Sequence, residues 1–128
     1  MPTKTLPYHG HSTLNLDIVI NDIQKRISNV LIDTGFIHSI FGLKLPIEYS
    51  RYAKSLKTGP IKMVDGKSVD VQWIKAFIRG VQDYILVNQI PISIIFMTGN
   101  PIIGINFLKR YKICFDGPNN QTVLELDT

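Results

Sequence analysis

The sequence predicts an all-β protein that folds as a small closed β-barrel with one or two short helices. Two observations support this class. Short segments in which apolar and polar residues alternate, the period of a half-buried strand, recur along the chain. Turn-forming residues separate such segments about every eight to twelve positions. A chain of 128 residues suits one domain with one core, so we expect a single domain over residues 1–128.

The first strands are expected in the N-terminal third of the chain. Residues 14–20 alternate between apolar and polar types, and Asn21-Asp22 is a turn signal. Residues 27–32 then predict the returning strand. Residues 37–41 are again mostly apolar and β-branched, which favours a further extended segment.

Two other segments predict helices. Residues 45–56 place apolar side chains at helical spacing, and Pro46 suits the first turn of a helix. Residues 106–111 predict a second, shorter helix with Asn106 as its N-cap.

The rest of the chain predicts strands and hairpins. Asp-Gly at positions 65–66 is a favoured two-residue turn, so we expect the segments on either side of it to pair. The expected strands are residues 61–64, 69–78, 84–87, 92–97, 113–115 and 122–126.

Charge and hydropathy limit the classes of function. The chain has 14 Lys and Arg against 10 Asp and Glu, a net charge of +4, but the basic residues are scattered in runs no longer than two. A basic nucleic-acid-binding barrel therefore ranks well below other functions, and no nucleic-acid partner is expected. The longest apolar stretch is far shorter than a membrane span, and the N-terminus has no apolar signal segment. We expect no membrane association and a cytoplasmic location.

The single cysteine and the two closely spaced histidines, His9 and His11, do not predict a metal site. Cys114 lies in an apolar segment and is expected to be a small core residue, which fits a reducing compartment. His9 and His11 have a spacing compatible with metal binding, but no third ligand is evident. Both lie in residues 1–12, which we expect to form a flexible N-terminal arm. No metal and no cofactor is expected.

The segment Leu31-Ile32-Asp33-Thr34-Gly35 places a carboxylate at the end of an apolar strand. Such a strand holds the backbone beneath the carboxylate, and a glycine allows close approach by another backbone. One carboxylate cannot both activate a water and protonate a leaving group, whereas two facing carboxylates that share a proton can. The chain contains one such motif, so for this two-carboxylate chemistry the second Asp33 has to come from a second copy.

These residues resemble the retropepsin-like aspartic peptidases, the family that includes retroviral proteases and their cellular relatives. The family is marked by an apolar strand ending in Asp-Thr/Ser-Gly and a later apolar-apolar-Gly, present here as Ile102-Ile103-Gly104 before a short helical segment. Asp33-Thr34-Gly35-Phe36 looks like the prokaryotic branch that carries Asp-Thr-Gly-Phe. The resemblance covers about residues 14–126. It implies the retropepsin (acid protease) type of β-barrel, active as a homodimer on a peptide or protein substrate.

The resemblance also implies roles for individual residues. Asp33 from each of two chains would form the catalytic dyad, Thr34 would lock the two loops across the dimer axis, and Gly35 would contact the substrate backbone. Residues 60–75 match the hairpin that closes over substrate, the flap. The residues implied to contact substrate are Phe36, His38, Met63, Val64, Asp65, Gly66 and Trp73. Those implied to brace the loop are Ser39, Ile102, Ile103 and Gly104.

Several alternatives stay open. Phe36 replaces the small residue common in the viral enzymes, and the flap has only Gly66 near its tip. His38 suits the cleft or the surface equally, and packing is as good a role for Trp73 as substrate contact. Residues 122–126 are the candidate for part of a dimer sheet. The predicted function is that of a homodimeric aspartic endopeptidase, and the alternative is a catalytically silent dimer of the same fold that binds peptides or proteins.

Overall fold

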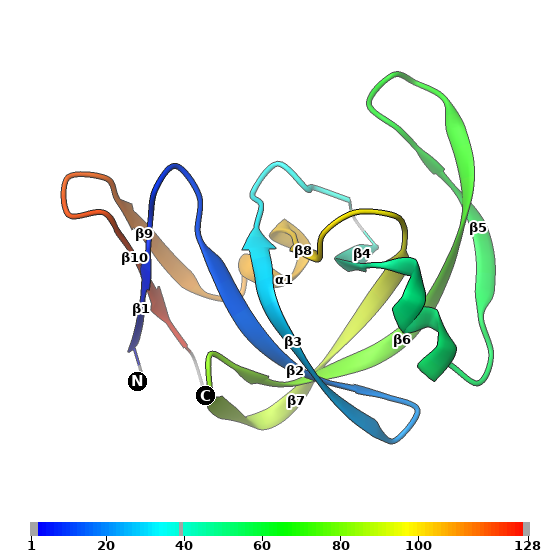
Figure 1. The fold of residues 1–128 in the computed structure, drawn as a ribbon, viewed down its shortest axis with the longest axis horizontal. Helices are drawn as coiled ribbons and strands as arrows, with labels where there is room; N and C mark the ends of the chain where they lie inside the picture. The colour runs from blue at the N-terminus through cyan, green and yellow to red at the C-terminus, as the bar shows by residue number, and fades with distance from the viewer. Residues whose placement is uncertain (1–2, 39, 127–128) are drawn as a thin grey trace.

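The computed structural model describes residues 3–38 and 40–126, and in these residues the chain is mainly β-structure (Figure 1). The strands are β1 (Thr3–Pro7), β2 (Thr13–Ile20), β3 (Ile23–Ile32), β4 (Phe41–Leu45), β5 (Lys57–Lys62), β6 (Ser68–Val81), β7 (Tyr84–Phe96), β8 (Ile102–Ile103), β9 (Lys112–Asp116) and β10 (Gln121–Glu125). The helices are the 3₁₀-helix η1 (Ile47–Tyr52) and the α-helix α1 (Ile105–Leu108). None of the helices in this part of the chain is long and apolar enough to cross a membrane.

The larger sheet closes into a barrel, as the sequence predicts. Its strand order is β2-β3-β8-β4-β7-β6-β5, and an additional pairing of β2 with β6 completes the ring. β8 runs parallel to β3 and antiparallel to β4, and β4 runs parallel to β7. Because β8 runs parallel to β3, the segment that follows β3 and the segment that follows β8 emerge at the same end of the barrel.

The β2–β3 hairpin forms as predicted, and both of its strands are longer than the predicted ones. Buried and half-buried side chains alternate along β2, which is the pattern of a strand with one face on the core. Asn21 and Asp22 both have positive φ, at 47° and 69°, which matches the turn whose twist suits a two-residue hairpin. β3 therefore begins at Ile23, directly opposite Ile20.

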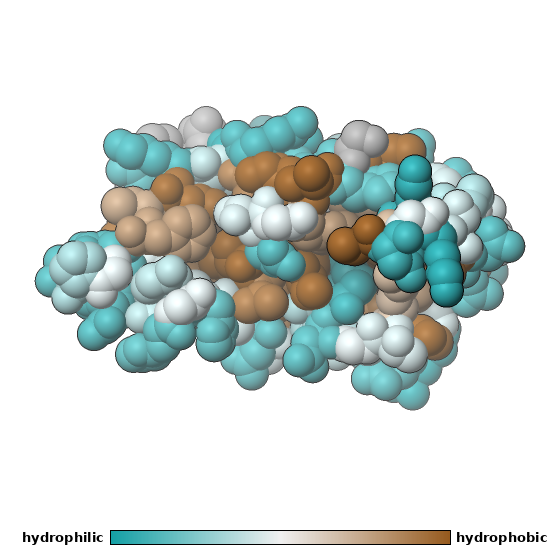
Figure 2. All heavy atoms as spheres, turned by 90° about the horizontal axis from the view of Figure 1, so that it is seen from above, coloured by the Kyte–Doolittle hydropathy of each residue, from teal (hydrophilic) through white to brown (hydrophobic). Residues whose placement is uncertain are grey.

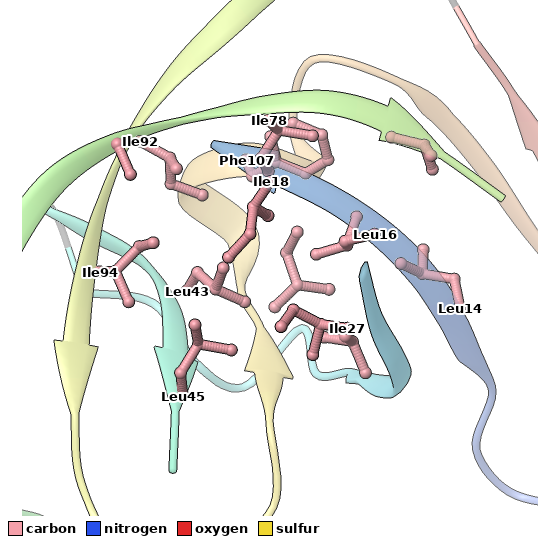
Figure 3. Packing of buried hydrophobic residues seen from close by; sticks show 14 of the residues in the cluster. Leu14, Leu16, Ile18, Ile27, Leu43, Leu45, Ile78, Ile92, Ile94 and Phe107 are labelled. Carbon is pink, nitrogen blue, oxygen red and sulfur yellow. The ribbon is translucent and has the colours of Figure 1, made fainter. Parts of the chain in front are cut away.

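The core fills the barrel interior. Its apolar side chains come from nearly every strand and from α1 (Figure 3). Ile18 of β2, Leu43 of β4 and Ile78 of β6 are completely buried, and Phe107 of α1 is 2% exposed. Residues far apart in sequence thus share one apolar interior, and removal of this surface from water is the main stabilising contribution.

The predicted helix over residues 45–56 is wrong in type and length. Leu45 is the last residue of β4, where it pairs with Phe96. Pro46 is extended, with ψ of 148°, and only Ile47–Tyr52 are helical, as a 3₁₀-helix. The apolar spacing reflects packing on the core, because Tyr49 and Tyr52 are partly buried against it.

The two short strands predicted over residues 84–87 and 92–97 are one strand. β7 runs without a break through Pro91, which lies opposite Phe77 of β6. The pairing of β7 with β4 begins only at Ser93, so the missing N–H of proline removes no bond to β4.

The second predicted helix also differs. α1 begins one residue earlier than expected, at Ile105, and Gly104 rather than Asn106 is its N-cap. No side-chain hydrogen bond caps this helix. The backbone N–H groups of Phe107 and Leu108 instead donate to the Gly104 carbonyl.

A separate three-stranded sheet, in the order β1-β10-β9, joins the two ends of the chain. The predicted flexible arm is wrong for Thr3–Pro7, which pair with β10, whereas residues 1 and 2 lie outside the described residues. β10 has a neighbour on both sides, so residues 122–126 cannot extend a partner's sheet directly. Cys114 is exposed, which makes its predicted core position wrong.

Candidate active site

Asp33 follows the last residue of β3 and is fixed by the neighbouring strand β8. Leu31 and Ile32 lie opposite Ile102 and Ile103 in the parallel pair. The Asp33 N–H donates to the Ile103 carbonyl over 3.0 Å, which carries the parallel pairing one residue beyond β3. The two predicted motifs, far apart in sequence, are therefore in direct contact.

The chain turns tightly after Asp33. One carboxylate oxygen of Asp33, Oδ1, accepts the Gly35 N–H at 2.8 Å, and the Asp33 carbonyl accepts the Phe36 N–H at 3.2 Å. Asp33 is half-buried, whereas Thr34 and Gly35 are exposed. The carboxylate is thus held in place at the rim of the barrel, and the next two residues face outward.

Gly104 supports this turn from below. Its N–H donates to the Gly42 carbonyl at 2.9 Å, and the N–H of Ile105 donates to the Phe36 carbonyl at 3.0 Å. A Cβ on Gly104 would overlap the Phe36 carbonyl oxygen and would lie 2.6 Å from Cδ2 of the Phe36 ring. The residue after β8 has to be glycine for the Phe36 backbone to approach this closely.

His38 braces the loop that leaves the site. Its Nδ1 accepts the backbone N–H groups of Ile40 and Phe41, at 3.1 and 3.3 Å, and its ring centroid lies 4.7 Å from that of Phe41. The side chain is therefore engaged with its own loop, and substrate contact by His38 stays a prediction. Ser39, the predicted brace, lies outside the described residues.

The β5–β6 hairpin projects from the barrel, in the region predicted as the flap (Figure 1). Its turn is longer than the two residues predicted at Asp65-Gly66. The Gly66 N–H donates to the Met63 carbonyl at 2.9 Å, so Val64 and Asp65 are the central residues, and Gly66 follows with φ of 86°. Val64 at the tip is fully exposed.

A second apolar cluster ties the base of this hairpin to the loop after Asp33. Phe41, Ile61, Val71 and Ile95 form its buried part. Phe36 and Trp73 pack against it, and the Trp73 ring meets Phe41 edge-on at 5.5 Å. Lys57 Nζ lies 4.8 Å from the Trp73 ring. Trp73 is thus partly buried against this cluster, and Phe41 is a structural partner of the site that sequence reasoning missed.

A groove of about 620 Å³ borders the strand that leads to Asp33. Leu31, two residues before Asp33, forms part of its lining and lies opposite Thr13 of β2. The remaining lining residues are His11, Ser28, Asn29, Asn100 and Pro101. Sequence reasoning considered only His11 among these residues, and as a metal ligand. Within residues 3–38 and 40–126, no three His, Cys, Asp or Glu side chains are grouped to hold a metal.

The side of the molecule where β3 ends carries apolar surface. Figure 2 shows this side, with apolar atoms gathered in the middle of the face and polar atoms around them. In the loop after Asp33, Ile37 is 72% exposed and Ile40 is 56% exposed. A contiguous exposed apolar patch bordered by polar residues is typical of a surface that binds a partner or ligand.

Comparison with known proteins identifies the fold. No protein-family model matches the sequence, and no curated protein sequence matches it. Among solved structures, a retropepsin-like aspartic protease from Rickettsia conorii is similar, with a TM-score of 0.61 and 16% sequence identity. The match covers 96% of this chain and 89% of the Rickettsia chain. The chain therefore has the retropepsin-like fold, with its single Asp-Thr-Gly segment on the loop that follows β3.

Proposed function

We propose that the chain is an aspartic endopeptidase that acts as a homodimer, with one Asp33 carboxylate from each copy. The observation that carries this proposal is the support of Asp33 by β8, through the 3.0 Å bond from the Asp33 N–H to the Ile103 carbonyl. A half-buried carboxylate on a rigid strand end, flanked by the exposed Thr34 and Gly35, can face its counterpart across a two-fold axis.

The proposed reaction is hydrolysis of a peptide bond by a water held between the two carboxylates. The ionised carboxylate takes a proton from the water as the water oxygen attacks the scissile carbonyl carbon. The protonated carboxyl gives its proton to the carbonyl oxygen. Collapse of the resulting diol breaks the C–N bond, as the carboxyl that took its proton from the water gives that proton to the nitrogen and the other carboxylate takes a proton from a diol hydroxyl. The products are a carboxylic acid and an amine. The two carboxylates return to their shared-proton state.

The proposed substrate is an extended peptide that lies between the loop after β3 and the β5–β6 hairpin. The exposed tip at Val64 suits a flap that closes over the chain and excludes water. The exposed Ile37 and Ile40 would meet apolar side chains of the peptide. The groove beside Leu31 has room for one further side chain.

The test is cleavage of a peptide library between about pH 4 and pH 7 by the wild type and by Asp33→Asn. Asp22→Asn is the matched control, because Asp22 is an exposed carboxylate in the β2–β3 turn, outside both the loop after β3 and the β5–β6 hairpin. We expect Asp33→Asn to lose cleavage and Asp22→Asn to retain it. Cleavage that survives Asp33→Asn would contradict the mechanism.

The dimer requirement is tested by dilution. Activity per chain should fall as the protein is diluted, because half of the dyad comes from each copy. Full activity per chain in a sample shown to be monomeric by sedimentation would contradict a shared site. Peptide binding without cleavage under every condition would favour the alternative, a silent binding module of the same fold.

A further inference from the structure

We propose that two copies of this chain pair along β9, antiparallel, across a two-fold axis at Cys114. This inference rests on the proposed function in one respect only, which is that a second copy is needed to complete the site. β9 forms one edge of the three-stranded sheet, with β10 on one side and no strand of the described chain on the other. An open strand edge presents unpaired N–H and C=O groups that another chain can bind.

The sequence of β9 is self-complementary about its central residue. If Cys114 lies opposite Cys114 of the partner subunit, Lys112 lies opposite Asp116 of the partner subunit, and Asp116 lies opposite the partner's Lys112. The two apolar residues match as well, because Ile113 lies opposite Phe115 of the partner subunit. Each dimer thus contains two opposite-charge pairs and two apolar pairs, all of which favour this register.

The exposure of the β9 side chains fits this pairing. Lys112 and Cys114 are exposed, and no carboxylate lies within ion-pair distance of Lys112 in the described part of the chain. Phe115 is 44% exposed, although its neighbour Ile113 packs against the core. Pairing would extend the apolar face of the sheet from Ile113 across the axis and cover the open side of Phe115. Asp116 also accepts two hydrogen bonds from Asn119, so its carboxylate is already positioned.

The strand at the other edge of the same sheet, β1, is less suited to pairing with a second copy. An antiparallel pair centred on Thr5 would place Lys4 opposite Leu6, with no charge complementarity. β1 also ends in Pro7, which has no N–H to donate across an interface. Of the two edges of this sheet, β9 is therefore the better partner for a second copy.

The position of β9 agrees with a shared active site. In Figure 1 the β9–β10 hairpin, the loop after β3 and the tip of the β5–β6 hairpin all reach the upper side of the molecule. A second copy that binds this side can contact all three. In the proposed dimer, the paired β9 strands and the two facing Asp33 carboxylates share one two-fold axis.

The first test uses charge reversal in the Asp33→Asn background, so that association is measured without catalysis. Asp116→Lys places Lys opposite Lys112 of the partner subunit twice per dimer, and Lys112→Glu places Glu opposite the partner's Asp116 twice. We expect each variant alone to dimerise at least about tenfold more weakly. An equimolar mixture should recover tight association, because every charged pair in the heterodimer is then opposite in sign.

The mixture also serves as the folding control, because a chain that fails to fold cannot restore association. Asp116→Asn is the matched control for the loop, since it removes the charge but keeps an oxygen for Asn119. Its dimer should be weakened less than that of Asp116→Lys. Sedimentation velocity gives the dissociation constants. Equal dissociation constants for the two single variants, their mixture and the parent would overturn the β9 interface.

The second test uses the only cysteine of the chain. Directly opposite residues in an antiparallel pair have Cβ atoms about 5 Å apart, so oxidation or a short bismaleimide should join two copies through Cys114. The matched control is Cys114→Ser/Thr5→Cys, which moves the thiol to the other edge of the same sheet, because Thr5, Val123 and Cys114 lie in one row. We expect covalent dimer from the parent and little from the control.

The two tests separate this inference from the proposed function. A dimer that resists cross-linking at Cys114 but cross-links through Thr5→Cys would overturn the β9 interface and leave the aspartic dyad intact. A β9 dimer whose Asp33-containing form cleaves no peptide would support the interface and contradict the proposed function. A parent protein that stays monomeric at high concentration would overturn the interface outright.

Discussion

The backbone carbonyl of Phe36 and the Cα of Gly104 are in such close contact that residue 104 has no room for a side chain. The contact joins the turn after Asp33 to the end of β8, and the bond from the Ile105 N–H to the Phe36 carbonyl closes it at 3.0 Å. Two segments separated by about half of the chain are thereby held as one unit. The position of Asp33 depends on this unit as much as on β3.

Gly104→Ala should therefore destabilise the protein and displace the loop that carries Asp33. The added methyl would overlap the Phe36 carbonyl and ring, and overpacking of this kind costs about 1–3 kcal/mol. Urea denaturation measures the free energy of unfolding. Gly117→Ala is the matched control, because a Cβ there meets nothing within 4 Å. Equal stability of the two variants would show that the loop moves aside without cost.

Ser12→Ala should lower stability by about 1–3 kcal/mol, because it leaves buried polar groups without partners. The Ser12 hydroxyl donates to the Pro7 carbonyl at 2.7 Å and lies 2.6 Å from the Thr122 hydroxyl. Since the single Ser12 proton goes to Pro7, Thr122 is the donor of the second bond. The Ser12 carbonyl also accepts the Ile32 N–H, which links this pair to the strand before Asp33.

A double-mutant cycle with Thr122→Val tests the coupling of the two hydroxyls. The double variant should lose less stability than the sum of the single variants, because it removes both members of the pair. Thr122→Val alone should cost less than Ser12→Ala, since Ser12 keeps its bond to Pro7. Additive losses in urea denaturation would show that the two hydroxyls do not interact.

His38→Ala should loosen the loop between Asp33 and β4. It removes the acceptor of two backbone N–H groups, those of Ile40 and Phe41, at a cost of about 0.5–1.5 kcal/mol. His38→Asn is the matched rescue, because its amide oxygen can occupy the place of Nδ1. Recovery of stability and of peptide cleavage in His38→Asn would support the bracing role. Loss of cleavage in both variants with unchanged stability would instead assign His38 to substrate binding.

Tyr52 should ionise at a lower pH than an ordinary tyrosine. The hydrogen bond from Arg51, at 2.8 Å, lowers the pKa of the Tyr52 phenol, and Lys25 beside the ring lowers it further. The same bond raises the pKa of Arg51. The resulting contribution to stability is present at alkaline pH and is lost as the pH falls through the pKa of Tyr52 in the folded protein.

A difference titration of ultraviolet absorbance between the wild type and Tyr52→Phe isolates this phenol. Arg51→Gln should move its midpoint to higher pH, because the largest cause of the lowered pKa is then absent. Glu48→Gln is the control on the same 3₁₀-helix, and it should leave the midpoint of Tyr52 nearly unchanged. An identical titration in the wild type and Arg51→Gln would show that the bond to Arg51 does not form in solution.

The parts of the fold that depend on residues close together in the chain could be predicted from the sequence. The β2–β3 hairpin follows from alternation along residues 14–20 and from the turn residues Asn21 and Asp22, which act over a few positions. The Asp-Thr-Gly segment at the end of an apolar strand is equally local. The resemblance to retropepsin-like proteins rested on this segment and on Ile102-Ile103-Gly104, and the fold agrees with it.

Other features depended on partners far away in the chain. Leu45 belongs to β4 rather than to a helix because it pairs with Phe96, and the N-terminal segment is a strand because β10 is beside it. Trp73 of β6 packs against Phe41 of β4 because both strands pair with β7, which lies between them. No local pattern carries this information, since the energy comes from contacts between segments.

The sequence by itself thus determined that Asp33 ends an apolar strand, that the strand leads into Thr34 and Gly35, and that one chain supplies one such motif. The tertiary structure alone decided what holds that carboxylate, namely the Ile103 carbonyl and the contact of Phe36 with Gly104. It also decided that β9, with the exposed Cys114, is an edge strand of its sheet among the described residues. The physical reason is that residue type and spacing act along the chain, whereas support, burial and free edges arise only when distant strands pair.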